Sequence, residues 1–297
     1  MIRIAPMSRA DLGAARAVLA DACAFDDAAT VAEEKLFEPA PGAPVSAWGA
    51  WIDEALVGVV AVSAAWVRIL AVAPPARRRG VGAALLVHAE AALRAAGISR
   101  ARAVGQPGNY LAPGIDERDA ETIAWLTRRG WSVGAHRTVN LLIAVRDHPR
   151  VSPERSAAAA QRAAGYHIAR ARPDEIDELA AAVASEFGGT WDAELTRAMA
   201  LDPPGVHVAR LEGACPEIAA FAVHDGNNQG LGWFGPAGTW PAHRGRGLGE
   251  ALLLACLVDV AAFRDVCEVA WIGPRAFYER AVGVTGERRF VSMTKEL

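Results

Sequence analysis

The sequence predicts an α/β (α+β) protein built from two tandem domains of one type, each a mixed, mostly antiparallel twisted sheet flanked by helices. Three observations lead to this prediction. A chain of 297 residues has room for two domains of roughly 150 residues each. The segments Arg77–Leu86 and Arg244–Leu253 share the pattern R-x-x-G-x-G-x-A-L-L and lie 167 positions apart. Ile2–Ile4 and Tyr166–Ile168 begin similar stretches, each followed by an acidic residue and an alanine-rich run.

The repeat sets the expected domain boundaries. We expect a first domain over residues 1–147, a linker over 148–165 and a second domain over 166–297. The linker contains Arg150-Val151-Ser152-Pro153 and the run Ala157–Ala160, which together hold few large apolar residues.

The first copy shows alternating strand patterns and two helices that end at glycines. Ser8 is a suitable N-cap for the first helix, with Asp11 three residues later. Gly97 and Gly130 are expected to end the two later helices. Residues 47–52 and 55–63 alternate as a hairpin that turns at Asp53-Glu54. The expected elements are strand 2–5, helix 8–22, strands 47–52, 55–63 and 66–73, helix 81–96, strand 101–104, helix 117–129 and strand 137–145.

The second copy repeats this order, which supports duplication of a whole domain. Its expected elements are strand 166–170, helix 174–187, strands 206–211, 217–224 and 231–239, helix 248–263, strand 267–272, helix 274–282 and strand 288–295. Each copy therefore has one strand, glycine loop and helix in series, which is the pattern of a crossover between parallel strands.

Composition and charge exclude several protein classes. The chain is 52% hydrophobic and 22% charged, unlike a disordered chain. A formal net charge of −3 argues against a nucleic-acid partner. The apolar run Ala251–Val258 is too short to span a bilayer, and the first residues lack the apolar region of a signal peptide. We therefore expect a cytoplasmic protein without membrane contact.

The four cysteines, Cys23, Cys215, Cys256 and Cys267, show no C-x-x-C spacing. We interpret them as free thiols in a reducing compartment, with no disulfide framework and no metal site.

The repeated glycine segment has the chemistry of a phosphate site. A strand that leads through R-x-x-G-x-G into a helix presents backbone N–H groups at the helix N-terminus. The glycines allow close backbone approach, and the arginines add charge-assisted contacts. The spacing is neither the Rossmann fingerprint nor the P-loop, because no lysine follows the second glycine.

The segment resembles the acetyl-CoA signature of the GCN5-related N-acetyltransferases, the GNAT family, written Q/R-x-x-G-x-G/A. The element order resembles that family in both copies. The resemblance implies acetyl-CoA as cofactor, its pyrophosphate on the loop amides and its pantetheine along the preceding strand. By position the implied contacts in the second copy are Gly238, Thr239, Trp240, Arg244, Gly245, Arg246, Gly247, Leu248 and Gly249. In the first copy they are Ile69, Leu70, Ala71, Val72, Arg77, Arg78, Arg79, Gly80, Val81 and Gly82.

The resemblance also implies which copy is catalytic. The family's usual acid is a tyrosine on the helix after the fifth strand, in a context such as F-Y-E-K-x-G. The second copy has Phe277-Tyr278-Glu279-Arg280-Ala281-Val282-Gly283, with one extra residue before the glycine. The first copy has Leu126 at the tyrosine position, and leucine cannot donate a proton. We therefore expect Tyr278 to act in the second copy and the first copy to be accessory.

The general base is less clearly indicated by the sequence. Glu268 is a carboxylate in an otherwise apolar strand, and it either faces the cleft as a base or faces solvent. Glu250, His224 and His243 are the alternatives.

Two loops are candidates for contacting the acceptor. One follows the first helix of the second copy and holds Glu186 and Trp191, for which a surface position is an equal alternative. The other is Gly108–Asp116 in the first copy, which is either a turn-rich surface loop or an interdomain lid that contacts the acceptor.

Three functions remain open at this point. The first is an N-acetyltransferase that acts on a small-molecule amine. The runs N-Y-x-x-P-G-I-D at 109–116 and G-P-x-x-F-Y at 273–278 resemble tandem-GNAT acetyltransferases of glucosamine and glucosaminides, which favours an amino sugar. Other small amines and peptide amines stay open. The second is a CoA-binding sensor or regulator without transfer, and the third is a scaffold that has lost CoA, against which two intact glycine loops argue.

Overall fold

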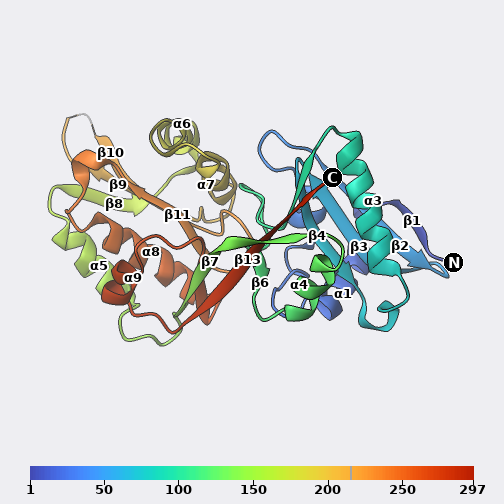
Figure 1. Ribbon diagram of the computed structural model, residues 1–297. Helices are drawn as coiled ribbons and strands as arrows, with labels where there is room; N and C mark the ends of the chain where they lie inside the picture. The colour runs from blue at the N-terminus through green and yellow to red at the C-terminus, as the bar shows by residue number, and fades with distance from the viewer. Residues whose placement is uncertain (215) are drawn as a thin grey trace. The chain divides into compact units, whose positions relative to one another are not determined.

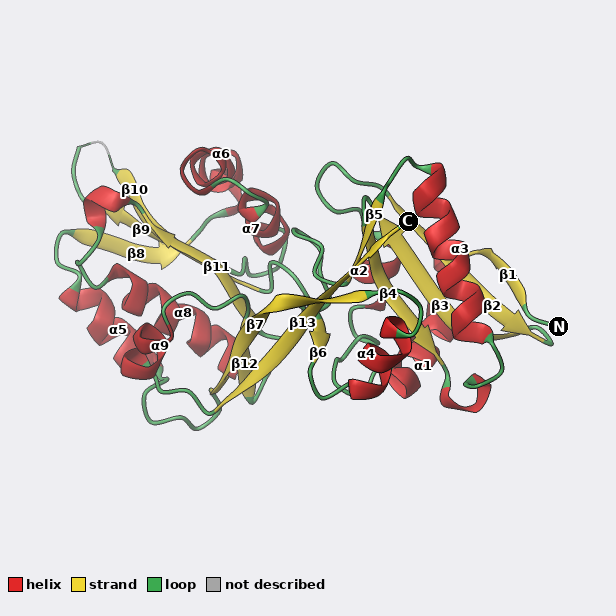
Figure 2. Cartoon of the chain, viewed as in Figure 1, coloured by secondary structure: helices red, strands yellow, loops and turns green. Residues whose placement is uncertain are grey.

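The computed structural model describes residues 1–214 and 216–297, so the prediction for Cys215 lies outside the described residues. The chain forms two compact units of mixed helix and strand (Figures 1 and 2). Unit 1 comprises Met1–Val139 and Arg289–Leu297, and unit 2 comprises Asn140–Arg288. The predicted α/β fold class is confirmed, since each unit combines antiparallel strands with one parallel pair joined by a crossover helix.

Unit 1 has a twisted sheet in the strand order β1-β2-β3-β4-β5-β13, with the short β6 beside β13. Strands β4 and β5 run parallel, and helix α3 connects them. The bounds are β1 (Arg3–Pro6), α1 (Leu12–Ala22), α2 (Ala32–Phe37), β2 (Val45–Ile52), β3 (Ala55–Ser63), β4 (Trp66–Val72), α3 (Val81–Ala95), β5 (Arg100–Ala103), β6 (Ile115–Asp116), α4 (Ala120–Thr127) and β13 (Gly286–Glu296).

Unit 2 repeats this plan in the strand order β7-β12-β11-β10-β9-β8, with β11 and β12 parallel and connected by helix α8. The bounds are β7 (Ser132–Ala144), α5 (Pro153–Arg162), β8 (Tyr166–Arg170), α6 (Ile176–Phe187), α7 (Trp191–Met199), β9 (Val206–Leu211), β10 (Glu217–His224), β11 (Trp233–Thr239), α8 (Leu248–Ala261), β12 (Val266–Val269) and α9 (Arg275–Ala281).

Two strands pass from one unit to the other. Strand β7 begins in unit 1, and its last residues, Leu141–Ala144, pair with β12 in unit 2. Strand β13 begins in unit 2, and its residues Met293–Glu296 pair with β5 in unit 1. The compact units therefore differ from the expected division into 1–147 and 166–297. An alternating strand pattern predicts which face is buried, but it does not identify the sheet that the strand joins.

The segment expected as a linker contains a helix. Ser152 caps α5 by accepting a hydrogen bond from the backbone N–H of Arg155 (3.3 Å), and Pro153 occupies the first turn. The alanine run continues the helix because alanine has the highest helix propensity. Helix α5 packs against α8 and buries Ala159. Small apolar residues therefore formed a packed helix rather than an open connection.

Helix α3 supplies much of the unit 1 core, where Leu85, Leu86, Ala89 and Leu93 are buried. In unit 2, helix α8 buries Leu252, Leu253 and Leu257, and a separate cluster from α6, α7 and the neighbouring strands includes Leu179 and Phe221. Burial of a leucine side chain contributes about 1.5–3 kcal/mol, so this burial holds α3 and α8 in place behind the glycine loops.

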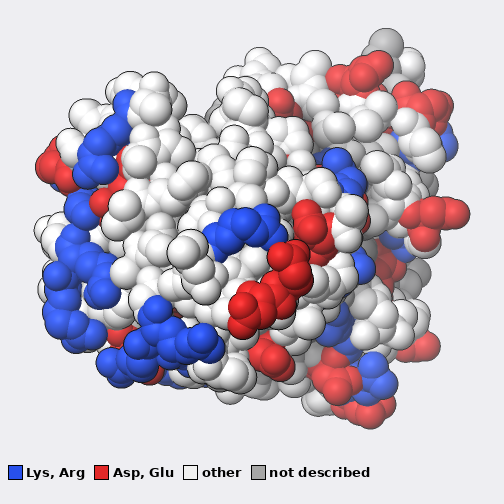
Figure 3. Space-filling model, turned by 90° about the vertical axis from the view of Figure 1, so that its right-hand side faces the viewer, with Lys and Arg blue, Asp and Glu red and all other residues white. Residues whose placement is uncertain are grey.

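Figure 3 shows Lys and Arg side chains gathered along the left margin of this face, whereas basic and acidic side chains adjoin one another toward its right side. Among residues 1–214 and 216–297, no helix has the length and apolar character needed to cross a bilayer. The same residues contain no cluster of three or more His, Cys, Asp or Glu arranged to bind a metal ion.

Candidate active site

The parallel strand pair separates at the same point in both units. Within residues 1–214 and 216–297, the pairing of β11 with β12 in unit 2 is limited to Trp233 and Phe234, and that of β4 with β5 in unit 1 to Trp66 and Val67. The two sites are 167 residues apart, as in the glycine loops. Beyond them the strands part, so one edge of β11 and of β4 has backbone groups that the neighbouring parallel strand does not use.

A bulge lies at each point of separation. The pairing of β4 with β3 shifts at Arg68, and the pairing of β11 with β10 shifts across Gly235 and Pro236. An extra residue in one strand bends that strand and turns its groups toward a new direction. Arg68 and Gly235 are equivalent in the repeat, but only unit 1 has a side chain larger than hydrogen there.

The two glycine loops have the same backbone conformation. Gly80 (φ 85°) and Gly247 (φ 80°) each precede a long helix in the left-handed region. Arg77 donates from Nε to the carbonyl of Val72 at 3.1 Å, and Arg244 donates to the carbonyl of Thr239 at 3.2 Å. Each arginine therefore fixes the loop against the end of its preceding strand.

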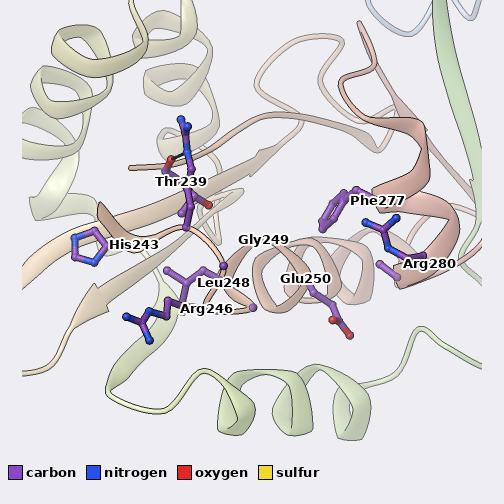
Figure 4. A pocket seen from close by; sticks show the side chains of 12 residues that line it. Thr239, His243, Arg246, Leu248, Gly249, Glu250, Phe277 and Arg280 are labelled. Carbon is purple, nitrogen blue, oxygen red and sulfur yellow. Dashed lines mark hydrogen bonds between the residues drawn. The ribbon is translucent and has the colours of Figure 1, made fainter. Parts of the chain in front are cut away.

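The N-terminus of α8 opens into a cavity of about 500 Å³ (Figure 4). No side chain caps this helix end, so its first backbone N–H groups are available to an anion. Arg246 and Arg280 add positive charge to the lining. These features fit the pyrophosphate of acetyl-CoA. The predicted residues that line the cavity are Thr239, Arg244, Gly245, Arg246, Gly247, Leu248 and Gly249.

Other lining residues were not predicted as contacts from the sequence. Phe277 of α9 would make an ordinary van der Waals contact, at 3.5 Å, with a Cβ on Gly249 of α8. The remaining ones are His243, Glu250, Arg280 and Ala281. Phe277 and Arg280 lie within two positions of the predicted acid, Tyr278. This closeness in sequence could have indicated that they line the cavity.

Gly238 and Trp240 do not line this cavity but belong to an aromatic cluster. A Cβ on Gly238 would lie 2.5 Å from the ring of Phe187, so only glycine permits that ring to pack on β11. Trp240 meets Phe187 edge to face at 4.9 Å, and Trp191 stacks on Phe187 at 5.4 Å. The structure thus places Trp191 in a packed cluster, whereas Glu186 is exposed.

The corresponding loop of unit 1 keeps the conformation with different side chains. Arg78 adopts φ 59° where unit 2 has Gly245, and it pairs with Glu121 at 3.0 Å. A Cβ on Gly82 would lie 3.3 Å from Trp125, which corresponds to Phe277. Of the other predicted residues, Arg79 and Gly80 are exposed, Ile69, Ala71 and Val81 are buried, and Leu70 and Val72 pack against the core.

Tyr278 lies on α9 with its ring 6.3 Å from Phe234, the last residue of β11 that pairs with β12. The predicted acid therefore lies beside the point where the strands separate. Burial, with a smaller contribution from nearby Cys267, raises the pKa of Tyr278 to about 12. The phenol is thus protonated at neutral pH. Leu126, at the equivalent place in unit 1, is part of the core.

Glu268 is buried and held by two partners. Its carboxylate accepts hydrogen bonds from Asn140 Nδ2 at 2.6 Å and from Arg288 Nη1 at 3.1 Å. Asn140 Oδ1 in turn accepts from the backbone N–H of Trp271, at the end of β12 (3.0 Å). The carboxylate therefore does not face solvent, and its ion pair favours a structural role over proton transfer.

The alternative bases are also engaged. His224 is buried and hydrogen-bonds Asp225 (3.2 Å) and Asp259 (3.3 Å). His243 bridges Tyr166 (3.1 Å) and Glu217 (3.3 Å). Burial alone would lower the pKa of His224, but its hydrogen bonds to the two carboxylates raise it.

Glu250 lines the cavity and pairs with Arg162 of α5 at 2.9 Å. Its carboxylate is therefore engaged by an ion pair, in the cavity that Phe277 and Arg280 also line.

The loop Gly108–Asp116 of unit 1 is largely buried, so its interpretation as a surface loop is wrong. Asn109 accepts a hydrogen bond from buried Lys35 at 2.9 Å, and Arg68 donates to Gln106 at 2.9 Å. Arg68 also donates to the carbonyl of Glu38 at 2.6 Å. The loop packed inward because its polar groups and those of α2 satisfy one another.

Residues 17–112 match the family model described as Acetyltransferase (GNAT) family. No curated protein sequence matches the chain.

Several solved structures share the fold. A GCN5-related glucosamine N-acetyltransferase region of a fungal multi-domain GH3 beta-N-acetylglucosaminidase is 18% identical with a TM-score of 0.76. The match covers 99% of this chain but only 38% of the fungal chain. A tandem GNAT protein from the clavulanic acid biosynthesis pathway is 19% identical with a TM-score of 0.70, over 100% of this chain and 98% of that chain. A GCN5-related N-acetyltransferase from Sphaerobacter thermophilus is 16% identical with a TM-score of 0.64, over 99% and 95% of the two chains.

The structural matches extend the fold of tandem GNAT proteins over the whole chain, and the repeated loop, bulge and strand separation occur in both units. Members of this family are acetyltransferases that use acetyl-CoA. Residues 17–112 are therefore similar to the GNAT acetyltransferase family, and the whole chain has the fold of tandem GNAT proteins.

Proposed function

We propose that unit 2 transfers the acetyl group of acetyl-CoA to a primary amine of a small molecule by direct attack of the amine on the thioester. The observation that carries this proposal is the alignment of three features on one unit. They are the cavity at the N-terminus of α8, the bulge of β11 at Gly235, and the protonated Tyr278 beside the strand separation.

The residues of unit 2 have distinct roles in this proposal. The loop amides from Gly245 to Gly249, with Arg246, bind the pyrophosphate. The backbone of β11 beyond Phe234 orients the pantetheine, because its groups are not used by β12. Acetyl-CoA supplies an activated acyl group, and the chain contributes orientation and charge stabilisation.

Tyr278 stabilises charge on the leaving sulfur. With a pKa of about 12 it is a weaker acid than an ordinary thiol, whose pKa is about 8.5. Full transfer of its proton to a thiolate is therefore uphill. A hydrogen bond from the phenol is sufficient to favour departure of the thiolate, and the proton on the phenol persists through neutral pH.

Unit 1 is proposed as the accessory copy. At the bulge, where unit 2 has Gly235, unit 1 has the buried guanidinium of Arg68, hydrogen-bonded to Gln106 and to the carbonyl of Glu38. Leu126 replaces the tyrosine. An acetyl group and an amine would have to displace a buried ionic network there, which costs several kcal/mol.

The acceptor is proposed to be an amino sugar. The support is the sequence resemblance at 109–116 and 273–278 together with the fold likeness to a region named as a glucosamine N-acetyltransferase. This chain matches 38% of the length of the fungal chain. We place the protein in the cytoplasm, consistent with free Cys23, Cys256 and Cys267.

The alternative is a CoA-binding protein without transfer. Release of free thiol from acetyl-CoA, measured with glucosamine, glucosaminides, polyamines and peptide amines, tests both. We expect turnover with amino sugars, loss of turnover in Gly247→Glu and retention in Gly82→Glu, because only the former blocks the unit 2 loop. CoA binding with no turnover on any amine would favour the alternative.

A further inference from the structure

A second cavity adjoins the glycine-loop cavity of unit 2. It has a volume of about 260 Å³ and lies between α5 and α8. Glu250 and Ala281 line both cavities, so the two share a wall. Figure 4 shows Glu250 pointing from α8 toward the green helix below it, which by colour is α5. A ligand bound at the loop therefore has a direct path to α5.

The lining of this second cavity is rich in arginine. Arg150, Arg155 and Arg162 contribute to it, against the two carboxylates Glu154 and Glu250. Arg162 pairs with Glu250 at 2.9 Å. Arg150 Nη1 donates to the carbonyl of Arg280 at 3.4 Å.

The side chain of Arg155 makes no hydrogen bond or ion pair with the described part of the chain, and it is exposed. Its guanidinium is therefore available to an anion.

We propose that the 3′-phosphate of CoA binds in this cavity, with Arg155 and Arg162 as its partners, and that helix α5 is part of the cofactor site. The inference rests on the proposed function of unit 2. With the pyrophosphate on the loop amides, the adenosine end of CoA would reach the second cavity past Glu250 and Ala281, which line both cavities. A phosphate dianion pairs with planar guanidinium groups through two parallel hydrogen bonds.

Binding rearranges one ion pair. Arg162 exchanges part of its contact with Glu250 for the phosphate, and Arg155 supplies the additional charge that offsets repulsion from Glu154 and Glu250. The helix that replaced the expected linker thus has a role in ligand binding in addition to packing on α8.

The matched ligands CoA and 3′-dephospho-CoA test this proposal, because they differ only in the phosphate. Dissociation constants are measured by calorimetry on the full chain and on Arg155→Gln, Arg155→Lys and Arg155→Gln/Arg162→Gln. Arg146→Gln serves as a control, since Arg146 belongs to the same unit, pairs with Asp265 and lines neither cavity. Circular dichroism verifies that each variant is folded.

We expect the native chain to bind CoA about tenfold more tightly than 3′-dephospho-CoA, as for exposed charge-assisted hydrogen bonds. The double variant should lose this preference with its affinity for 3′-dephospho-CoA unchanged. Arg155→Lys should keep only part of it, because lysine retains the charge but not the paired hydrogen bonds, and Arg146→Gln should keep all of it. The preference should also decrease with added salt.

Equal affinity of the native chain for the two ligands would overturn the subsite but leave the proposed function standing. A preference for CoA that survives in the double variant would place the 3′-phosphate elsewhere, and this result would also overturn the subsite. If neither ligand binds, the proposed function fails together with the subsite.

Discussion

Replacing each loop glycine by alanine separates backbone strain from function. Gly247 has φ 80° and Gly80 has φ 85°, and a Cβ on either residue meets no atom within 4 Å. The cost in each unit is therefore conformational only. A left-handed non-glycine residue costs about 1–2 kcal/mol, and the less flexible unfolded chain returns about 0.4–1 kcal/mol. The net loss of unfolding free energy is roughly 0.5–1 kcal/mol for both variants.

The two variants should differ in catalysis although they match in stability. Thermal unfolding should show a similar decrease in Tm, about 2–4 °C per kcal/mol for a unit of this size. In Gly247→Ala the amides at the start of α8 turn from the cavity whenever the loop relaxes its strain. We therefore expect at least a tenfold fall in kcat/KM for acetyl-CoA, and little change in Gly80→Ala.

Thiol release at varied acetyl-CoA concentration, together with calorimetric unfolding, measures both quantities. A larger loss of turnover in Gly80→Ala would refute the assignment of catalysis to unit 2. Equal retention of turnover in both variants would refute the argument that the loop amides bind the cofactor.

Three further predictions concern the side chains near the strand separation and the sheet of unit 2. Tyr278→Phe should lower kcat about 10- to 100-fold, measured by thiol release, with little loss of stability in urea unfolding. The control Tyr166→Phe should leave kcat unchanged. An unaltered kcat in Tyr278→Phe would remove the phenol from the mechanism. Glu268→Ala should lower the unfolding free energy by about 3–5 kcal/mol because the buried Arg288 loses the Glu268 carboxylate, and the second change Arg288→Met should recover part of that loss. If Glu268 were the base, a stable Glu268→Gln variant would instead lose turnover. The pKa of His224 is raised in the folded protein, so its contribution to stability is complete below about pH 6.5 and declines as the pH rises through the folded-state pKa. Urea titrations from pH 6 to 9 should show this decline in the unfolding free energy. In His224→Gln the unfolding free energy should depend less on pH.

Much of the fold and of the site could be predicted from the sequence because the same features occur twice. One offset of 167 positions relates the two glycine loops and the helices that follow them. This offset aligns Gly247 with Gly80 from the sequence alone. Short elements were harder to predict. Helix α2 has six residues and α7 has nine, too few for a clear helical period.

The partners of polar residues could not be predicted in this way. Glu268 stood out as a carboxylate in an apolar strand, but Asn140 is 128 positions away and Arg288 is 20 positions away. Only the fold brings them together, and it converts a candidate base into a member of an ion pair. The contacts of the α5 arginines could not be predicted for the same reason, because nothing in the expected linker sequence indicates that its helix packs on α8.

The return of β13 to unit 1 has a consequence for how the protein is made. Unit 2 is one continuous stretch, Asn140–Arg288, whereas unit 1 requires Arg289–Leu297, which include the buried core residues Val291 and Met293. During synthesis the second unit is therefore complete before the first, the reverse of the usual order in which domains fold from the N-terminus. A premature stop near the end of the message leaves unit 2 intact in sequence and unit 1 without the strand that pairs with β5. A separately expressed first half cannot stand in for unit 1 unless the last strand is supplied to it.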